Sequence, residues 1–107
     1  MDINITNSYG ATPLHYCVNE GYFEAAKFLI LKGANVNARD NDGCTPLHCA
    51  VDYEDIDFVN LLIGQNADVN IADNENRTPL HVALDHKNDE IVKALIQAGA
   101  HLNTQDD

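Results

Sequence analysis

Three residues in the middle of the chain have the chemistry of metal ligands. Cys44, His48 and Cys49 form a C-x3-H-C pattern, and thiolate and imidazole are ligands that zinc prefers. A closed zinc site needs four converging ligands, and the surrounding sequence offers no fourth. We therefore expect no metal site in this chain. Cys44 is predicted to be an exposed thiol, whereas Cys49 and Cys17 are predicted to be packed.

The segment Asp40-Asn41-Asp42-Gly43 has the composition of a calcium loop or of a turn. An EF-hand would need an acid at position 38 and a glutamate at position 49, which are Ala38 and Cys49. A turn is the simpler interpretation, because Asp and Asn bond to the local backbone and Gly adopts positive φ. The sequence contains no nucleophile with a base and an orienting group, and no phosphate-binding glycine loop. We therefore expect neither enzymatic activity nor a cofactor.

Three of the five histidines of the chain belong to a repeated motif. Thr12-Pro13-Leu14-His15 recurs after 33 residues as Thr45-Pro46-Leu47-His48, and after another 33 as Thr78-Pro79-Leu80-His81. A second motif recurs with the same 33-residue spacing at residues 33–37, 66–70 and 99–103. Histidines one repeat apart are too distant from one another to bind a single metal ion. Two different motifs that recur with one period indicate an array of similar structural units.

These motifs resemble those of ankyrin repeats, whose period is about 33 residues and whose signature is T-P-L-H-x-A. The resemblance covers units at about 7–39, 40–72 and 73–105 of a single domain, 1–107, and residues 1–6 look like the tail of a preceding unit. This tail favours a piece of a longer array over a complete three-unit protein. Three departures are local: Cys17 stands in an alanine position, and Asn66 and Asn76 stand in glycine positions.

The resemblance implies an all-α solenoid, in which helix-turn-helix units are joined by β-hairpin-like turns. It also implies that the signature histidines tie adjacent units together through backbone hydrogen bonds. Local chemistry agrees, since each Thr suits a helix N-cap and each following Pro suits the first helical position. Gly33, Asn66 and Gly99 suit left-handed residues at helix C-termini. The apolar spacing predicts helices at about 13–19, 22–31, 46–52, 55–64, 79–85 and 88–98.

Composition restricts the partners of such a domain. The 107 residues include 6 Lys and Arg against 17 Asp and Glu, for a net charge of −11. This balance argues against nucleic acid and against anionic membrane surfaces. No apolar run approaches the roughly 18 residues of a membrane span. The odd number of cysteines favours a reducing compartment. We expect a monomer in the cytoplasm, with the nucleus as the alternative location.

The resemblance implies a protein-binding module that uses a concave face, and it places variable contact residues at the turn tips and at the ends of the first helices. These positions are Ser8, Tyr9, Ala11, Asn19, Glu20, Arg39, Asn41, Asp42, Cys44, Asp52, Tyr53, Asn74, Glu75, Arg77, Asp85 and His86. Because acids predominate among them, we expect a basic protein or peptide as partner, anchored on Tyr53. A targeting or substrate-adaptor segment of a larger regulatory protein or enzyme is the alternative.

One asparagine could carry a modification. The resemblance implies that asparagines ending the hairpin motifs can be β-hydroxylated in animals, where a leucine lies eight residues before and an acid two before. Asn70 fits best, with Leu62 and Asp68 at those places. The alternative is that Asn70 only stabilises the hairpin.

Overall fold

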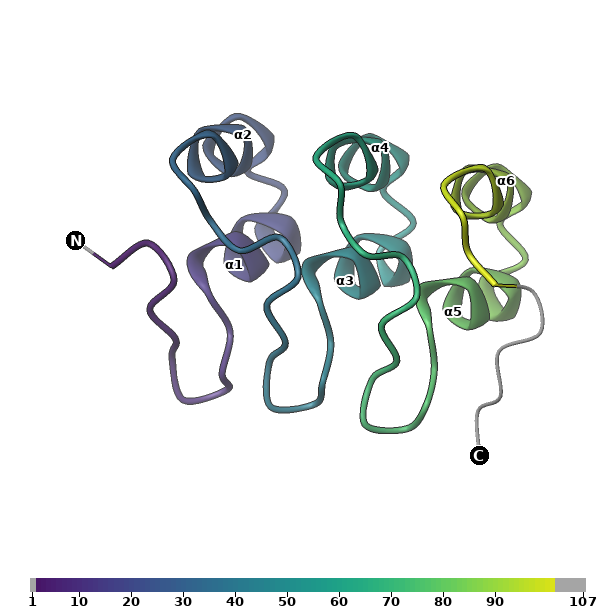
Figure 1. The fold of residues 1–107 in the computed structure, drawn as a ribbon, viewed down its shortest axis with the longest axis horizontal. Helices are drawn as coiled ribbons and strands as arrows, with labels where there is room; N and C mark the ends of the chain where they lie inside the picture. The colour runs from purple at the N-terminus through teal and green to yellow at the C-terminus, as the bar shows by residue number, and fades with distance from the viewer. Residues whose placement is uncertain (1, 102–107) are drawn as a thin grey trace.

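The computed structural model describes residues 2–101, which form six α-helices in three consecutive pairs (Figure 1). Figure 1 shows three rows: one helix of each pair in an outer row, the other in an inner row, and loops that project beyond the inner row. No strand occurs in the described residues, so the expected all-α fold is confirmed. The helices are α1 (Pro13–Glu20), α2 (Phe23–Leu31), α3 (Pro46–Asp52), α4 (Ile56–Gly64), α5 (Pro79–His86) and α6 (Asp89–Gln97).

The inner helices begin as predicted, at a threonine followed by a proline. In α1 the hydroxyl of Thr12 accepts from the N–H of His15 at 3.3 Å, and the N–H of Thr12 donates to Nδ1 of His15 at 3.1 Å. Thr45 and Thr78 make the same reciprocal bonds with their histidines. This box satisfies backbone donors that the first helical turn leaves without partners.

The helix ends differ from the prediction by one residue at several places. Glu20 and His86 extend α1 and α5. Tyr22, Asp55 and Asn88 are N-caps and not helical residues, and Ala98 is the C-cap of α6. Asp55 and Asn88 accept backbone bonds through their side chains, which is what polar N-cap residues do.

The outer helices end on left-handed residues, as predicted. The φ angle is 99° at Gly33, 66° at Asn66 and 102° at Gly99. Each lies one residue beyond the C-cap, where glycine and asparagine are favoured. The chain turns there toward the next loop. None of the described helices is long and apolar enough to cross a membrane.

The hydrophobic core runs continuously through the stack. Leu47, Phe58 and Leu62 of the second pair are essentially inaccessible to solvent. The ring of Phe58 meets that of Phe23 edge to face, with centroids 5.2 Å apart, so it also packs against the first pair. Burying such a side chain stabilises by roughly 1.5–3 kcal/mol. No helix pair could bury its apolar face alone, which is why the units must stack.

Two signature histidines tie neighbouring units together, which is the role that the resemblance implied. Nε2 of His15 lies 2.9 Å from the carbonyl oxygen of Cys44, and Nε2 of His48 lies 2.9 Å from that of Arg77. Because Nδ1 accepts from a threonine N–H, Nε2 carries the proton and donates it to the carbonyl. The corresponding carbonyl for His81 would belong to a fourth unit, so the structure tests this role only at His15 and His48.

Candidate interaction surface

The predicted contact residues come from the loop tips and the inner helices or directly adjoin them. We define the inner face as the loop tips, residues 7–11, 40–44 and 73–77, together with α1, α3 and α5. Most of the predicted contact residues are exposed there, including Ser8, Asn19, Glu20, Asp42 and Asp85. Tyr9 and Tyr53 are 75% and 60% exposed. Their contact with a partner stays a prediction.

Each tip is a compact turn organised by one side chain. Oδ1 of Asp40 accepts from the N–H groups of Asp42 at 2.9 Å and Cys44 at 3.0 Å, and a backbone bond from Asp40 to Cys44 closes the loop. Asn7 and Asp73 do the same in the other tips. The acids of residues 40–43 therefore make the predicted turn. Among residues 2–101, no group of three or more His, Cys, Asp or Glu side chains is arranged to hold a metal ion.

Asparagines link the tips into a ladder. Nδ2 of Asn41 donates to the carbonyl of Ser8 at 3.0 Å, and Nδ2 of Asn74 donates to the carbonyl of Asn41 at 2.8 Å. The backbone N–H of Asn41 also donates to the carbonyl of Tyr9 at 2.9 Å. Asn41 and Asn74 were predicted as contact residues, but the amide of each already donates one bond between units.

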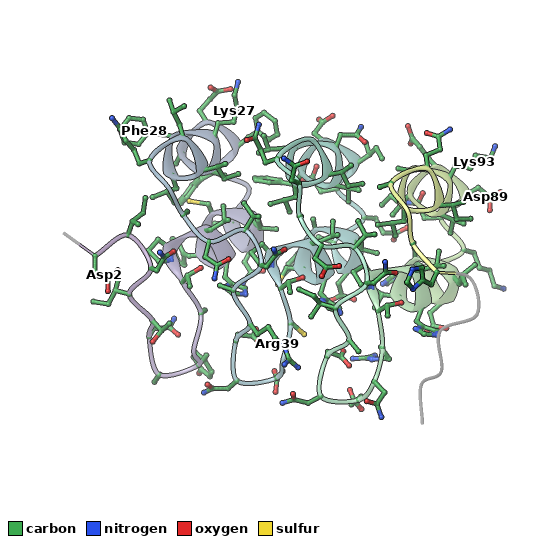
Figure 2. The ribbon with its side chains drawn as sticks, viewed as in Figure 1. Asp2, Lys27, Phe28, Arg39, Asp89 and Lys93 are labelled. Carbon is green, nitrogen blue, oxygen red and sulfur yellow. The ribbon has the colours of Figure 1, made fainter. Side chains whose placement is uncertain are left out.

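The two cations predicted for this face are also engaged within the protein. Arg39 donates through Nε to the carbonyl of Gly43 at 3.2 Å and through Nη2 to that of Ala72 at 3.1 Å. Figure 2 shows Arg39 on the loop side of the stack. Nη2 of Arg77 lies 3.1 Å from Oδ2 of Asp73 and 3.0 Å from Glu75.

Asp73 is the buried member of this ion pair. Burial by itself would raise the pKa of Asp73, but the N–H donors of Arg77 and Glu75 and the charge of Arg77 outweigh it and lower the pKa. The carboxylate is therefore held in its charged form.

A further cluster joins the ends of α3 and α5. Nε2 of His86 lies 3.1 Å from Oδ1 of Asp52, and its Nδ1 lies 3.8 Å from Glu54. Nδ2 of Asn88 donates to Glu54 at 3.2 Å. The sequence predicted Asp52 and His86 as contact residues but not Glu54, whose partners His86 and Asn88 lie about one repeat away.

The prediction that Cys44 is exposed is wrong. Its side chain is half-buried, because the tip folds back against the third unit. Burial, followed by the charges of Asp40 and Asp73, raises the pKa of Cys44 to about 11. Burial also raises the pKa of Cys49, to about 12, and Cys49 packs against the core as predicted. Cys17 is buried. All three thiols are free and protonated at neutral pH.

A small cavity opens between the second and third units. Its volume is about 130 Å³. The sequence did not predict this cavity, because its wall is built jointly by the two units. Its walls are made of Asp40, Cys44, His48, Cys49, Asp52, Asp73, Arg77 and Val82.

Asn70 also bridges two units. Its Oδ1 accepts from the N–H of His101 at 2.9 Å, and its Nδ2 donates to the carbonyl of Gly99 at 3.2 Å. The stabilising role of this side chain is thus explained by geometry. Its hydroxylation stays a prediction.

The fold is a helical-repeat solenoid. Its helix pairs are capped, stack at a constant period, and are joined to one another by side-chain hydrogen bonds. A family model described as ankyrin repeats (3 copies) matches residues 1–73 and 30–106. The chain belongs to the ankyrin-repeat family, as the resemblance indicated. Repeats of this family are non-catalytic modules that mediate protein–protein interactions.

One relative has a known activity. The chain is 41% identical over 39 residues to the ADP-ribosylation factor GTPase-activating protein AGD4 of Arabidopsis thaliana. The match covers 36% of this chain and 5% of that protein. The likeness is thus confined to a small segment of a much larger relative.

Proposed function

We propose that the inner face binds a basic segment of a partner protein. The observation that carries this proposal is how the two arginines near this face are bonded. Arg77 is paired with two acids, and Arg39 is held at backbone carbonyls, so among residues 2–101 the charge of Arg39 is the one cation of this face left to offset its other acids. Glu20, Asp42 and Asp85 remain exposed there. A field of one sign favours encounter with an oppositely charged partner.

Of the remaining cations, all but Lys87 belong to the outer helices or their ends. Figure 2 shows Lys27 and Lys93 projecting from the outer helices α2 and α6. Lys32 follows α2, and Lys87 lies in the turn after α5. This separation makes the inner face more acidic than the outer one, which supports a partner rich in lysine or arginine.

Tyr53 is proposed as the apolar anchor of this partner. It is 60% exposed, follows α3 near the middle of the stack, and adjoins Asp52. Tyrosine offers a large contact area at low conformational cost and is over-represented among residues that dominate interface energies. Truncating it is expected to act mainly on the off-rate, whereas changing a nearby charge acts mainly on the on-rate.

The test is selection from a random 12-residue peptide library on the full chain. We expect the selected peptides to be enriched in Lys and Arg and to bind more weakly as salt rises through about 0.1 M, where the screening length is ~10 Å. Asp52→Lys should weaken them further. Asp57→Lys, the same change on the outer helix α4, is the matched control. Selected peptides without excess positive charge, or binding that ignores both salt and Asp52→Lys, would contradict the proposal.

A targeting or substrate-adaptor segment of a larger protein is the second candidate. It is favoured by the match to AGD4, in which the similar segment is 5% of the length. Both candidates use the same surface, so the surrounding reading frame separates them: an adjoining catalytic domain supports the adaptor role. Under either, we propose a monomer in the cytoplasm, with the nucleus as an option, which light scattering and imaging of a tagged chain can test.

A further inference from the structure

The third unit contains an ion pair whose counterpart in the second unit is incomplete. Nε of Arg77 lies 3.2 Å from Oδ2 of Asp73, and its Nη2 lies 3.0 Å from Glu75. One repeat earlier, Asp40 and Asp42 occupy the places of the two acids, and Cys44 occupies the place of Arg77. The second unit thus keeps both carboxylates and lacks the cation.

The consequence is a carboxylate oxygen without a counter-charge. Oδ1 of Asp40 accepts two backbone bonds, as Oδ1 of Asp73 does. Oδ2 of Asp40 has no hydrogen bond or ion pair to any residue between 2 and 101. The preceding cation, Arg39, is directed instead to the carbonyls of Gly43 and Ala72.

Asp40 lines the cavity between the second and third units. The cavity volume, about 130 Å³, is well below the roughly 300–1,000 Å³ of small-molecule sites, and it suits one long side chain. Val82 and Cys49 supply apolar wall for an aliphatic stem, and Asp52 contributes a second acid.

The other charged groups at the cavity do not cancel this negative potential. The charge of Arg77 is already matched by Asp73 and Glu75. Burial lowers the pKa of His48, which therefore stays neutral at pH 7. Asp52 lies 3.1 Å from His86, the last residue of α5. Asp40 is left as a carboxylate of the cavity that no side chain of residues 2–101 pairs with.

We propose that this cavity receives an arginine side chain of the partner, whose guanidinium pairs with Asp40 as Arg77 pairs with Asp73. The proposal rests on the proposed function, since it locates one basic residue of the same partner. Arginine is the expected residue because its fork can direct two N–H donors to one carboxylate, as Nε and Nη2 of Arg77 do at Oδ2 of Asp73.

The experiment uses N-acetyl-arginine amide as the probe and N-acetyl-citrulline amide, its neutral isostere, as the control. Both are titrated into the full chain while backbone amide resonances are followed by NMR. We expect the arginine probe alone to shift the amides of Asp42, Cys44 and Val82 saturably. Asp40→Asn keeps the acceptor that organises the tip and should weaken the probe at least tenfold.

A second variant tests the proposal even if Asp40→Asn disturbs the structure of the tip. Cys44→Arg supplies the guanidinium from within the chain, copying Arg77, and should abolish binding of the probe without lowering the melting temperature. Asn60→Arg adds the same charge on the outer helix α4 and should leave the dissociation constant within twofold. Equal shifts with citrulline, or full binding by Cys44→Arg, would overturn the proposal.

The selected basic peptides separate this inference from the proposed function. If Cys44→Arg weakens them at least tenfold more than Asn60→Arg does, the cavity is supported. If both variants bind them like the original chain, with the same salt dependence, the cavity proposal fails and the basic partner stands. If no basic peptide binds while the arginine probe does, the partner assignment fails and the cavity remains.

Discussion

The imidazole of His48 and the backbone carbonyl of Arg77 are joined across the interface between the second and third units, with Nε2 2.9 Å from the oxygen. The other ring nitrogen is bonded to the N–H of Thr45 at 3.1 Å. One side chain therefore closes a helix N-terminus in its own unit and fixes the next unit against it. His15 makes the equivalent bonds one repeat earlier.

We expect His48→Ala to destabilise the protein by about 1–3 kcal/mol, because the carbonyl of Arg77 and the N–H of Thr45 would lose their partner in a buried place. Chemical denaturation followed by circular dichroism measures this. The matched control is His86→Ala, since His86 is a partly exposed histidine whose partners are the exposed acids Asp52 and Glu54. A change no larger at position 48 than at position 86 would contradict the structural role.

The free energy of unfolding should fall as the pH drops from about 7 to 5. Burial lowers the folded-state pKa of His48 below its unfolded value near 6.5, so the unfolded chain binds the proton first. The stabilisation is present above about pH 6.5 and is lost as the pH falls toward the folded pKa. Asp73, whose pKa is also lowered, adds a separate loss below about pH 4. Between pH 7 and 5, the free energy of unfolding should change less steeply with pH in His48→Ala than in the original chain. An unchanged slope would mean that other groups cause the pH dependence.

Gly64→Ala should stabilise the chain by about 0.5–1 kcal/mol. Gly64 is the last residue of α4, and an added Cβ would meet no atom within 4 Å. Gly33 is equally open but has a φ of 99°, so Gly33→Ala should destabilise. Thermal melts of the two variants separate the effect of free space around the added Cβ from the effect of the backbone conformation. Stabilisation by both, or by neither, would count against this explanation.

Lys87→Gly should stabilise by about 1 kcal/mol, because Lys87 ends α5 in a left-handed conformation with φ 58°, which costs an L side chain energy. Gly21 occupies the same place after α1, with φ 79°, and Gly21→Lys should be destabilising by a similar amount. Comparing the midpoints of urea denaturation tests both signs. The two substitutions must change stability in opposite directions. A loss of stability in Lys87→Gly would contradict the explanation, because it would mean that the Lys87 side chain makes a favourable contact.

Much of the backbone was determined by the sequence alone, because the relevant interactions are local. The capping box between Thr12 and His15 spans four residues, and the left-handed positions at Gly33, Asn66 and Gly99 depend only on the residue present and its neighbours. The 33-residue period then predicted the stack, since equal units with apolar faces can bury them only against one another. Errors at helix ends were single residues, either at a cap or at the last helical position.

The chemistry of the inner face was decided by the tertiary structure. Cys44 was expected to be exposed, yet the third unit half-covers it, and Arg39 and Asn41 were expected to face a partner, yet they bond to neighbouring units. These partners lie about one repeat away, so no local pattern reports them. Whether a surface side chain is free depends on how two units pack, and packing brings Asp40 to a cavity that neither unit has by itself.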